Sequence, residues 1–365
     1  MKKSVILRTA AALLAAVSLC FLPVGATSAR HAIVMDGQTG KVLYEKNATA
    51  RSLVASCTKI MTALLVCQQT NVLDPVQIPK EAVGVEGSSM YLQAGEVLAV
   101  QELLYGLMLC SGNDAAVALA IHCAGSVEAF AQQMNQKAQE LGLDGTHFVN
   151  PHGLDAPEHY STARDLAVLA AYAMKNPIFA QTVSTQKVTV GNRYLTNHNK
   201  LLWQVDGADG VKTGYTKAAG RILVSTAVQQ GRRLVCVTVD DPNDWADHKA
   251  FYQQFFPRYA TRQVVQAGDI LGTRSIVSGR EDQVDLVASE GFFFALAEGE
   301  TLQICLENRP FVYAPVCENG YAGRAFILVD GKVVGAVAVH YGKTVEQQVS
   351  PKRSWWEKIF GEKKK

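Results

Sequence analysis

The feature that most constrains the fold of this chain is a change in the spacing of its apolar residues. Four segments repeat apolar side chains every three or four positions, as amphipathic helices do: residues 56–66, 100–124, 127–141 and 162–175. Strand-like alternation or short apolar runs lie on both sides of them: residues 32–45, 187–190, 210–216, 221–228 and 233–239. Residues 245–259 return to helical spacing. Strands before and after a helical region predict an α+β domain built on an antiparallel sheet.

Beyond residue 262 the pattern changes to short strand-like runs separated by turn residues. The turns include Gly268-Asp269, Asn319-Gly320 and Asp330-Gly331. This pattern predicts a small all-β domain over residues 263–349. With 365 residues, 48% of them hydrophobic, the chain is long enough to bury two cores.

Residues 1–29 have the composition of a signal peptide. Three basic residues precede an apolar run over residues 9–24, and small residues follow it. Two peptide bonds fit the small-x-small cleavage pattern, one after Ala26 and one after Ala29. An uncleaved anchor helix is the alternative, but the run is shorter than the roughly 20 residues that span a bilayer. The sequence therefore predicts an exported protein.

The last segment, residues 350–365, is basic and amphipathic. On a helix its large apolar side chains share one face: Trp355, Trp356, Ile359 and Phe360. This pattern predicts a tail that binds the outer surface of the cytoplasmic membrane, and a solvated tail is the alternative. Before these residues no basic stripe occurs, and the net charge is only +2. We therefore expect no nucleic-acid partner.

The cysteines do not predict a disulfide framework. Of eight, Cys20 lies in the predicted signal peptide, which leaves an odd number that cannot all pair. Most lie in apolar helix or strand patterns, where a thiol behaves as a small hydrophobic group. We therefore expect them to be core residues.

The first motif that carries chemistry is Ser56-Cys57-Thr58-Lys59. A serine and a lysine three apart on one helix share a face, so an amine can lie beside the hydroxyl and accept its proton. Alone the motif means little, because residue frequencies give roughly one or two chance matches in a chain of this length. Ser184 and Lys187 have the same spacing, but a strand-like run follows them, so we expect no shared face and no catalysis there.

Two further motifs accompany the first. Ser111-Gly112-Asn113 lies at a break between two helical patterns, where side chains can project into a cleft; a simple helix N-cap is the alternative. Lys212-Thr213-Gly214 lies in a strand-like run, and only about a tenth of a chance match is expected for it. The glycine would let a substrate backbone approach closely.

The three motifs, in this order and about 55 and 100 residues apart, resemble the set of penicillin-binding proteins and serine β-lactamases. Other segments are similar to the low-molecular-mass D-alanyl-D-alanine carboxypeptidases: residues 87–90, 150–154, 159–165 and 210–220. The similarity covers residues 32–262 well and the β domain more loosely. It implies a penicillin-binding-protein and serine β-lactamase-like transpeptidase fold, with a catalytic domain over residues 30–262.

The resemblance also implies a reaction. Ser56 would attack the bond between the last two D-alanines of a peptidoglycan stem peptide, release D-alanine and form an acyl-enzyme that water hydrolyses; β-lactam antibiotics would acylate the same serine. Lys59 would be the base, although a lysine with an ordinary pKa is neutral in only about one molecule in a thousand at neutral pH. Burial and the second ammonium of Lys212 would lower its pKa.

The remaining roles follow from the same resemblance. Ser111 would pass the proton to the leaving amine, and Asn113 would bind the substrate backbone and help to hold Lys59. Lys212, Thr213 and Gly214 would form the opposite wall of the cleft. The backbone amides of Ser56 and Tyr215 would form the oxyanion hole.

Five further residues are candidates for lining the cleft: Ser88, His152, Arg164, His198 and Thr216. Packing is the alternative for the histidines, and a surface ion pair is the alternative for Arg164. Some relatives carry an arginine that reads the terminal carboxylate after the strand ending here at residue 239, but this chain has Asp-Asp-Pro-Asn-Asp over residues 240–244. The candidates for that role are Lys212, Thr213 and Thr216.

The sequence leaves other functions open. A β-lactamase would need a glutamate that activates water, and Glu140 comes close to that motif, although a solvated helix end explains it better. An endopeptidase on the same fold and a non-catalytic cell-wall scaffold are further alternatives. Zinc is not expected, because His152, His159 and His198 lack metal-site spacing, and no other cofactor is implied.

Overall fold

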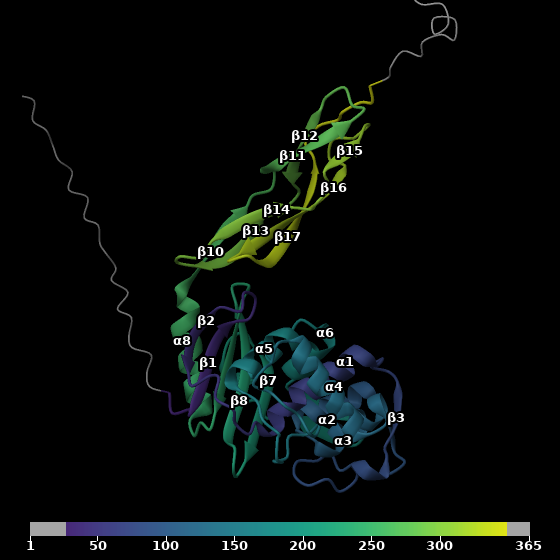
Figure 1. Ribbon diagram of the computed structural model, residues 1–365, viewed down its shortest axis with the longest axis vertical. Coiled ribbons are helices and arrows are strands. Elements are labelled where there is room, and N and C mark those ends of the chain that lie inside the picture. The colour runs from purple at the N-terminus through teal and green to yellow at the C-terminus, as the bar shows by residue number, and fades with distance from the viewer. Residues whose placement is uncertain (1–26, 349–365) are drawn as a thin grey trace, which may run out of the picture.

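The computed structural model describes residues 27–348 and shows two domains arranged along one long axis (Figure 1). Residues 1–26 of the predicted signal peptide and the predicted tail at residues 350–365 lie outside the described residues. In the figure all labelled helices lie in the larger domain, and all labels in the smaller domain belong to strands.

The larger domain is built on a five-stranded antiparallel sheet with the order β2-β1-β9-β8-β7. Its strands are β1 (His31–Asp36), β2 (Val42–Lys46), β7 (Ala208–Thr216), β8 (Gly220–Gln229) and β9 (Arg232–Val239). The predicted hairpin at residues 32–45 thus forms β1 and β2. The edge strand β7 carries the Lys212-Thr213-Gly214 motif. The backbone N–H and C=O groups on its outer side pair with no strand in the described chain, so they are open to a substrate.

Both faces of the sheet are buried, and β1 shows how. Ile33 and Met35 join the core that includes α1–α6, whereas Ala32 and Val34 join a second core with α8. Successive side chains of a strand point to opposite faces, so one strand supplies two cores. This arrangement explains why every residue of β1 is buried.

The helices lie mainly on one face of the sheet. They are α1 (Lys59–Gln69), α2 (Val100–Leu109), α3 (Asn113–Ala124), α4 (Val127–Glu140), α5 (Ala163–Ala173), α6 (Pro177–Ser184), α7 (Leu201–Gln204) and α8 (Asp244–Phe255), with short 3-10 helices η1 (Ala55–Thr58), η2 (Lys80–Ala82) and η3 (Phe256–Arg258). Two small hairpins complete the domain: β3 (Pro75–Gln77) with β4 (Val97–Ala99), and β5 (Lys187–Val190) with β6 (Arg193–Thr196).

The predicted α+β architecture is confirmed, with one helix shorter than expected. Residues 245–259 were expected to be one helix, but α8 ends at Phe255 and η3 follows. Pro257 lacks a backbone N–H and cannot continue an α-helix. Among the described residues no single helix is long and apolar enough to cross a bilayer; only α3 and α4 taken together, bent by 83°, meet that criterion.

The smaller domain is all-β, as predicted. Its strands are β10 (Tyr259–Val265), β11 (Ile270–Val277), β12 (Gln283–Ala288), β13 (Phe292–Ala297), β14 (Leu302–Leu306), β15 (Phe311–Tyr313), β16 (Tyr321–Val329) and β17 (Lys332–Tyr341). Six of them form a sheet in the order β14-β16-β17-β12-β11-β15, and β10 pairs with β13. Since β10 begins at Tyr259, the predicted boundary at residue 262 falls inside this strand.

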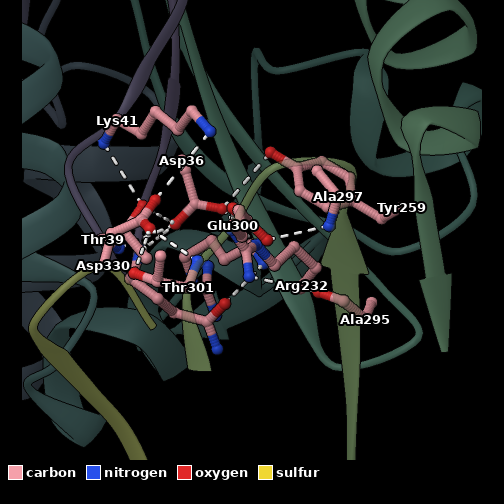
Figure 2. A network of polar contacts seen from close by, with 12 residues as sticks. Asp36, Thr39, Lys41, Arg232, Tyr259, Ala295, Ala297, Glu300, Thr301 and Asp330 are labelled. Atoms are coloured by element: carbon pink, nitrogen blue, oxygen red, sulfur yellow. Dashed lines mark hydrogen bonds and ion pairs between the residues drawn. The ribbon is translucent and has the colours of Figure 1, made fainter. Parts of the chain in front are cut away.

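A buried ionic network joins the two domains (Figure 2). The guanidinium of Arg232, at the start of β9, pairs with Asp36 of β1 and with Glu300 of the β domain, and all three side chains are inaccessible to solvent. Tyr259 and Phe294 lie against the guanidinium, with their ring centroids 4.5 and 4.9 Å from its central carbon.

The cysteines only partly follow the prediction that they are core residues. All seven in the described part of the chain are free thiols, and Cys57, Cys67 and Cys236 are buried. Cys305 and Cys317 are exposed, because β14 is an edge strand and Cys317 lies in a turn before β16. Strand-like spacing does not show which strand lies at the edge of a sheet.

Candidate active site

Ser56 lies on η1, the 3-10 turn that runs directly into α1. The predicted helix from residue 56 therefore begins as a tighter 3-10 turn and becomes α-helical at Lys59. Ala55 enters this turn with a φ of +43°, a conformation that L-residues rarely adopt. Gly153 packs against this bend, and a Cβ at Gly153 would lie 1.9 Å from the carbonyl oxygen of Ala55.

Lys59 is fully buried, and its amine makes three polar contacts. Its Nζ lies 2.9 Å from Ser56 Oγ, 2.6 Å from Asn113 Oδ1 and 2.7 Å from the backbone carbonyl oxygen of His152. The amide and carbonyl oxygens can only accept hydrogen bonds. A neutral amine would donate to both and keep its lone pair for the serine hydroxyl.

The surroundings favour that neutral form. Burial lowers the pKa of Lys59 well below its ordinary value, and the positive charge of Lys212 lowers it further. Burial also lowers the pKa of Lys212, to about 8. The two lowered pKa values therefore allow Lys59 to be a neutral base while Lys212 is still a cation.

Ser111 and Asn113 lie at the turn between α2 and α3. Ser111 is buried with a φ of +66°, which marks a strained backbone for a residue other than glycine. The helix α3 begins at Asn113, its N-cap is Gly112, and no side chain of the motif caps it, so the alternative of a simple side-chain N-cap is wrong. The backbone N–H of Asn113 donates to the carbonyl of Ser88 over 2.7 Å. This contact ties the turn to the loop that contains Ser88.

The opposite wall is β7. Lys212 is buried and donates from Nζ to the carbonyl of Thr213 over 2.8 Å. Gly214 packs against the nucleophile turn: a Cβ there would lie 3.2 Å from the Val54 carbonyl oxygen and 3.3 Å from Cys57 Sγ. A side chain at this position would have to displace these neighbours by a few tenths of an ångström, so glycine suits the close approach of β7. The backbone beyond Gly214, at Tyr215, is thus held near Ser56.

An open cavity of about 600 Å³ lies between these walls. Of the predicted residues it is lined by Ser56, Ser88, Ser111, His198, Thr213, Gly214 and Tyr215. Sequence reasoning missed eight lining residues: Thr196, Asn197, Lys200, Trp203, Arg221, Ile222, Asp244 and Trp245. They come from β6, α7, β8, α8 and the β6–α7 connection, and no motif marks them.

Three candidates for lining the cleft make other contacts. Arg164 pairs with Glu45 between two partly exposed side chains, which agrees with the surface ion pair considered as the alternative. Thr216 Oγ1 donates to Asp155 Oδ1 over 3.1 Å. His152 contributes its backbone carbonyl to Lys59, while its Nδ1 accepts from the N–H of Leu154.

His159 contacts the nucleophile turn through Thr58. Its Nδ1 accepts from the N–H of Val149 over 3.1 Å, so Nε2 carries the proton and donates to Thr58 Oγ1 over 2.8 Å. Burial lowers its pKa to about 4, which keeps the ring neutral. Within residues 27–348 no group of three histidine, cysteine or acidic side chains could hold a metal ion.

The second serine–lysine pair is arranged differently. Ser184 is the last residue of α6 and donates from Oγ to the carbonyl of Gln181, whereas Lys187 begins the strand β5. The two residues lie on different elements, as expected. Glu140, considered for a β-lactamase, lies at the exposed end of α4 and pairs with Lys137.

Comparison with known proteins agrees with this geometry. The family model of D-alanyl-D-alanine carboxypeptidases, peptidase family S11, matches residues 21–243. This chain belongs to that family. A second model, the C-terminal domain of penicillin-binding protein 5, matches residues 259–347 of this family member.

Relatives of this carboxypeptidase-family protein span most of its length. D-alanyl-D-alanine carboxypeptidase DacF of Bacillus subtilis is 32% identical over 325 residues, which is 85% of this chain and 84% of DacF. DacC of Escherichia coli is 33% identical over 340 residues, covering 88% of this chain and 82% of DacC.

Solved structures confirm the predicted fold family. Penicillin-binding protein 5 of Haemophilus influenzae superposes with a TM-score of 0.64 at 29% identity, covering 88% of this chain and 98% of that one. The peptidoglycan synthesis regulatory factor PBP3 of Streptococcus pneumoniae has a TM-score of 0.75 at 25% identity, covering 88% of this chain and all of that one. The carboxypeptidase-family protein thus has a penicillin-binding-protein fold followed by an all-β domain.

This family member has an arginine in the cavity that no motif predicted. Arg221, at the start of β8, lies opposite Tyr215 in the sheet and lines the cavity. Its Nε and Nη2 bind Asp244 of α8 at 2.9 to 3.2 Å. Arg221 therefore joins Lys212, Thr213 and Thr216 as a candidate for reading the substrate carboxylate.

Proposed function

We propose that this protein is a serine-type D-alanyl-D-alanine carboxypeptidase. It removes the terminal D-alanine from peptidoglycan stem pentapeptides through an acyl-enzyme on Ser56, and β-lactam antibiotics acylate the same residue. The observation that carries the proposal is the set of contacts around Lys59 Nζ, which lies 2.9 Å from Ser56 Oγ and has two acceptor oxygens as its other partners. This arrangement leaves the amine lone pair for the hydroxyl proton.

Acylation needs two proton transfers. Lys59 takes the proton of Ser56 as Oγ attacks the carbonyl carbon of the penultimate D-alanine, and the backbone N–H groups of Ser56 and Tyr215 stabilise the oxyanion. The C–N bond then breaks as the leaving amine receives a proton from Lys59 through Ser111. Water then adds its oxygen to the acyl carbonyl carbon, the C–O bond to Ser56 breaks, and Oγ takes up a proton from that water. The shortened stem peptide leaves and Ser56 is free again.

The substrate would lie along β7. Its backbone would bind Asn113 on one side and the free ladder edge of β7 on the other, with Lys212 and Thr213 near its negative end. His198 and Ser88 line the same cavity and would contact the stem peptide. Support for this pose comes from the edge position of β7 in the sheet.

The covalent step is tested with labelled penicillin. We expect the wild type to become labelled and Ser56→Ala to remain unlabelled, because Oγ is the only atom removed. Ser184→Ala is the matched control, since it changes the serine of the other S-x-x-K pair, and it should label like the wild type. Equal labelling of wild type and Ser56→Ala would overturn the assignment.

The substrate is tested by mass spectrometry of a stem peptide ending in D-Ala-D-Ala. Loss of one alanine is expected of a carboxypeptidase. Cleavage of a crosslinked peptide without that loss would indicate an endopeptidase, and rapid penicillin hydrolysis would indicate a β-lactamase. A non-catalytic scaffold would leave all three substrates unchanged.

Export is part of the proposal, with cleavage of the signal peptide after Ala26. Thr27 Oγ1 and the Ser28 N–H bind the Asp247 carboxylate at 2.5 and 2.8 Å, and Ala29 is fully buried in the core that includes α8. A cut after Ala29 would remove these contacts from the mature domain. Mass spectrometry of the exported protein should give a chain beginning at Thr27, and a chain beginning at Arg30 would contradict this.

The tail at residues 350–365 would bind the outer face of the cytoplasmic membrane. The support is the aromatic and aliphatic face of Trp355, Trp356, Ile359 and Phe360 beside basic residues. Removing residues 351–365 should release most of the protein from membranes, as measured by fractionation. Unchanged recovery with the membrane would count against the tail.

A further inference from the structure

The distal end of the β domain exposes a pair of aromatic side chains. Phe311 and Tyr313 lie on β15 with 47% and 65% of their surface accessible, and their rings contact each other at a centroid distance of 5.5 Å. Val277 of β11 pairs with Tyr313 in parallel register and is 38% exposed. Side chains paired in this way lie on the same face of the sheet, so the three residues form one apolar surface.

This surface lies at one edge of the six-stranded sheet. β15 is the last strand in the order β14-β16-β17-β12-β11-β15, so its outer side has no neighbouring strand in the described chain. Edge strands of soluble proteins generally carry charged residues or proline, because an exposed apolar edge promotes aggregation. Two exposed aromatic residues at such an edge point to a partner that covers them.

The chain leaves the β domain beside this surface. The N–H of Gln348, the last described residue, donates to the carbonyl of Ser278 over 2.8 Å, directly after Val277. Trp355 follows seven residues later, so an extended connection between them reaches at most about 25 Å. In Figure 1 the strand β15 and the exit of the chain lie at the same end, opposite the catalytic domain.

Val277, Phe311 and Tyr313 are together called the distal apolar surface. We propose that this surface inserts into the interface of a phospholipid bilayer beside the C-terminal tail. The inference rests on the membrane location given under the proposed function. A tail bound to lipid holds the distal end within reach of the bilayer, and aromatic side chains are favoured at the headgroup level. Two contacts, one on the tail and one on a rigid sheet, would also fix the direction in which the β domain projects.

The nearby charges favour an apolar rather than an electrostatic contact. Arg280 pairs with Glu346 at 2.8 Å, and Lys343 pairs with Glu281, so the basic groups at this end are matched by acidic ones. Binding through the distal apolar surface should therefore persist at high salt. Binding through the basic tail should weaken as salt screens its attraction to anionic lipid.

The test is co-sedimentation with vesicles of equal parts phosphatidylglycerol and phosphatidylethanolamine. Four proteins are compared: the mature chain, its Phe311→Ser/Tyr313→Ser variant, the chain lacking residues 351–365, and that shortened chain with the same two substitutions. Phe293→Ser is the matched control, because Phe293 is 61% exposed but lies on β13 near the catalytic domain. Penicillin labelling of each sample reports whether the catalytic domain is intact.

We expect the double substitution to lower the partition coefficient of the mature chain about tenfold, as loss of interfacial apolar area predicts, and the control to leave it unchanged. The shortened chain should keep weak, salt-insensitive binding that the double substitution abolishes. If the double variant and the control bind like the mature chain, the proposal is wrong. Tyr313→Ser alone repeats the test with a side chain that is mostly exposed, should the double variant fold poorly.

The outcomes separate this proposal from the others. Loss of penicillin labelling would concern the assignment of Ser56 and not the distal apolar surface. Unchanged binding after removal of residues 351–365 would contradict membrane binding by the tail, but not membrane binding by the distal apolar surface. An effect of the two substitutions only when the tail is present, with no residual binding of the shortened chain, would show that the surface packs against the tail and would overturn contact with lipid.

Discussion

At the scale of single residues, Lys59 is the side chain whose surroundings decide the chemistry. Its fully buried amine lies within hydrogen-bond distance of one hydroxyl and two acceptor oxygens, with a second buried lysine nearby. Burial makes the neutral amine stable, and the two acceptors orient it so that the lone pair faces Ser56. A lysine in solution would meet neither condition.

The two lysines predict a bell-shaped pH dependence of kcat/KM for a D-Ala-D-Ala peptide. Activity should rise with pH as Lys59 loses its proton, at a pH well below the ordinary lysine pKa. Activity should fall above about pH 8, because Lys212, whose pKa is about 8, then loses the charge that attracts the substrate carboxylate. Lys212→Arg keeps that charge, so the alkaline limb should move to higher pH; an unmoved limb would contradict the role of Lys212.

Gly153 predicts a sharp steric effect on the nucleophile turn. Its φ is +88° and an added Cβ would lie 1.9 Å from the Ala55 carbonyl oxygen, so Gly153→Ala combines a backbone cost of about 1–2 kcal/mol with overpacking of about 1–3 kcal/mol. Penicillin acylation should fall at least about tenfold, because the turn carrying Ser56 must move. Urea denaturation and acylation rates measure the two effects.

Gly142→Ala is the matched control for this substitution. Gly142 has a φ of +67° and no neighbouring atom within 4 Å of an added Cβ. It should therefore show only the backbone cost, with normal acylation. Equal losses in the two variants would show that the clash with Ala55 is unimportant.

At the scale of elements, the start of α3 holds the loop that forms one rim of the cavity. Asp114 is buried, and its carboxylate accepts hydrogen bonds from Ser89 Oγ at 2.6 Å, the Met90 N–H at 3.0 Å and the Leu92 N–H at 3.1 Å. Arg193 of β6 binds the carbonyl of Met90 from the other side. One helix terminus and one hairpin thus position the loop that carries Ser88.

Asp114→Asn should loosen this loop while preserving the size of the side chain. The amide nitrogen would face the N–H of Leu92 and leave a buried donor unpaired, which costs about 1–3 kcal/mol in unfolding free energy. We expect kcat/KM to fall about tenfold, because Asn113 and Ser88 lose their fixed positions. Urea denaturation and peptide hydrolysis measure the two quantities.

Ser126→Ala controls for a general loss of stability. Ser126 caps α4 by accepting a hydrogen bond from the N–H of Ala129, and losing such a cap costs about 1 kcal/mol. Its activity at 25 °C should equal that of the wild type. If both variants lose activity in proportion to stability, Asp114 has no positioning role.

At the scale of the whole molecule, the buried network of Arg232 fixes the β domain on the catalytic domain (Figure 2). Besides its two ion pairs, Arg232 donates from Nη1 to the carbonyl of Ala295 over 3.1 Å. Asp36 also accepts from the N–H of Thr39 at 2.7 Å, and Glu300 accepts from the N–H of Ala297 at 2.8 Å. Both carboxylates that pair with the guanidinium are thus held by further hydrogen bonds within their own domains.

Arg232→Met should lower the free energy of unfolding by about 3–5 kcal/mol, since it leaves two buried carboxylates without a counter-charge. Limited proteolysis should then cut near residue 258, where the domains join. Arg280→Met is the matched control, because the Arg280–Glu346 pair is exposed and such pairs contribute about 0–1 kcal/mol. Equal losses in the two variants would show that the network contributes no more than a surface ion pair.

The sequence by itself determined which residue types were available for the reaction and the order of the elements. Period-two runs predicted the five strands of the catalytic sheet, and helical spacing predicted α1 to α5, because these patterns follow directly from local backbone geometry. The motifs identified Ser56, Lys59, Ser111, Asn113 and Lys212. They also excluded Ser184, because a strand-like run follows it.

Only the tertiary structure decided how these residues meet. Lys59 contacts a side chain 54 positions away and a backbone carbonyl 93 positions away, and a carbonyl has no sequence signature because every residue carries one. Arg221 likewise lines the cavity because its strand pairs with β7, where Tyr215 lies opposite it. The partner of Arg232, Glu300, lies 68 positions away in the sequence. Burial, pKa shifts and domain contacts arise from such long-range packing, so local patterns cannot determine them.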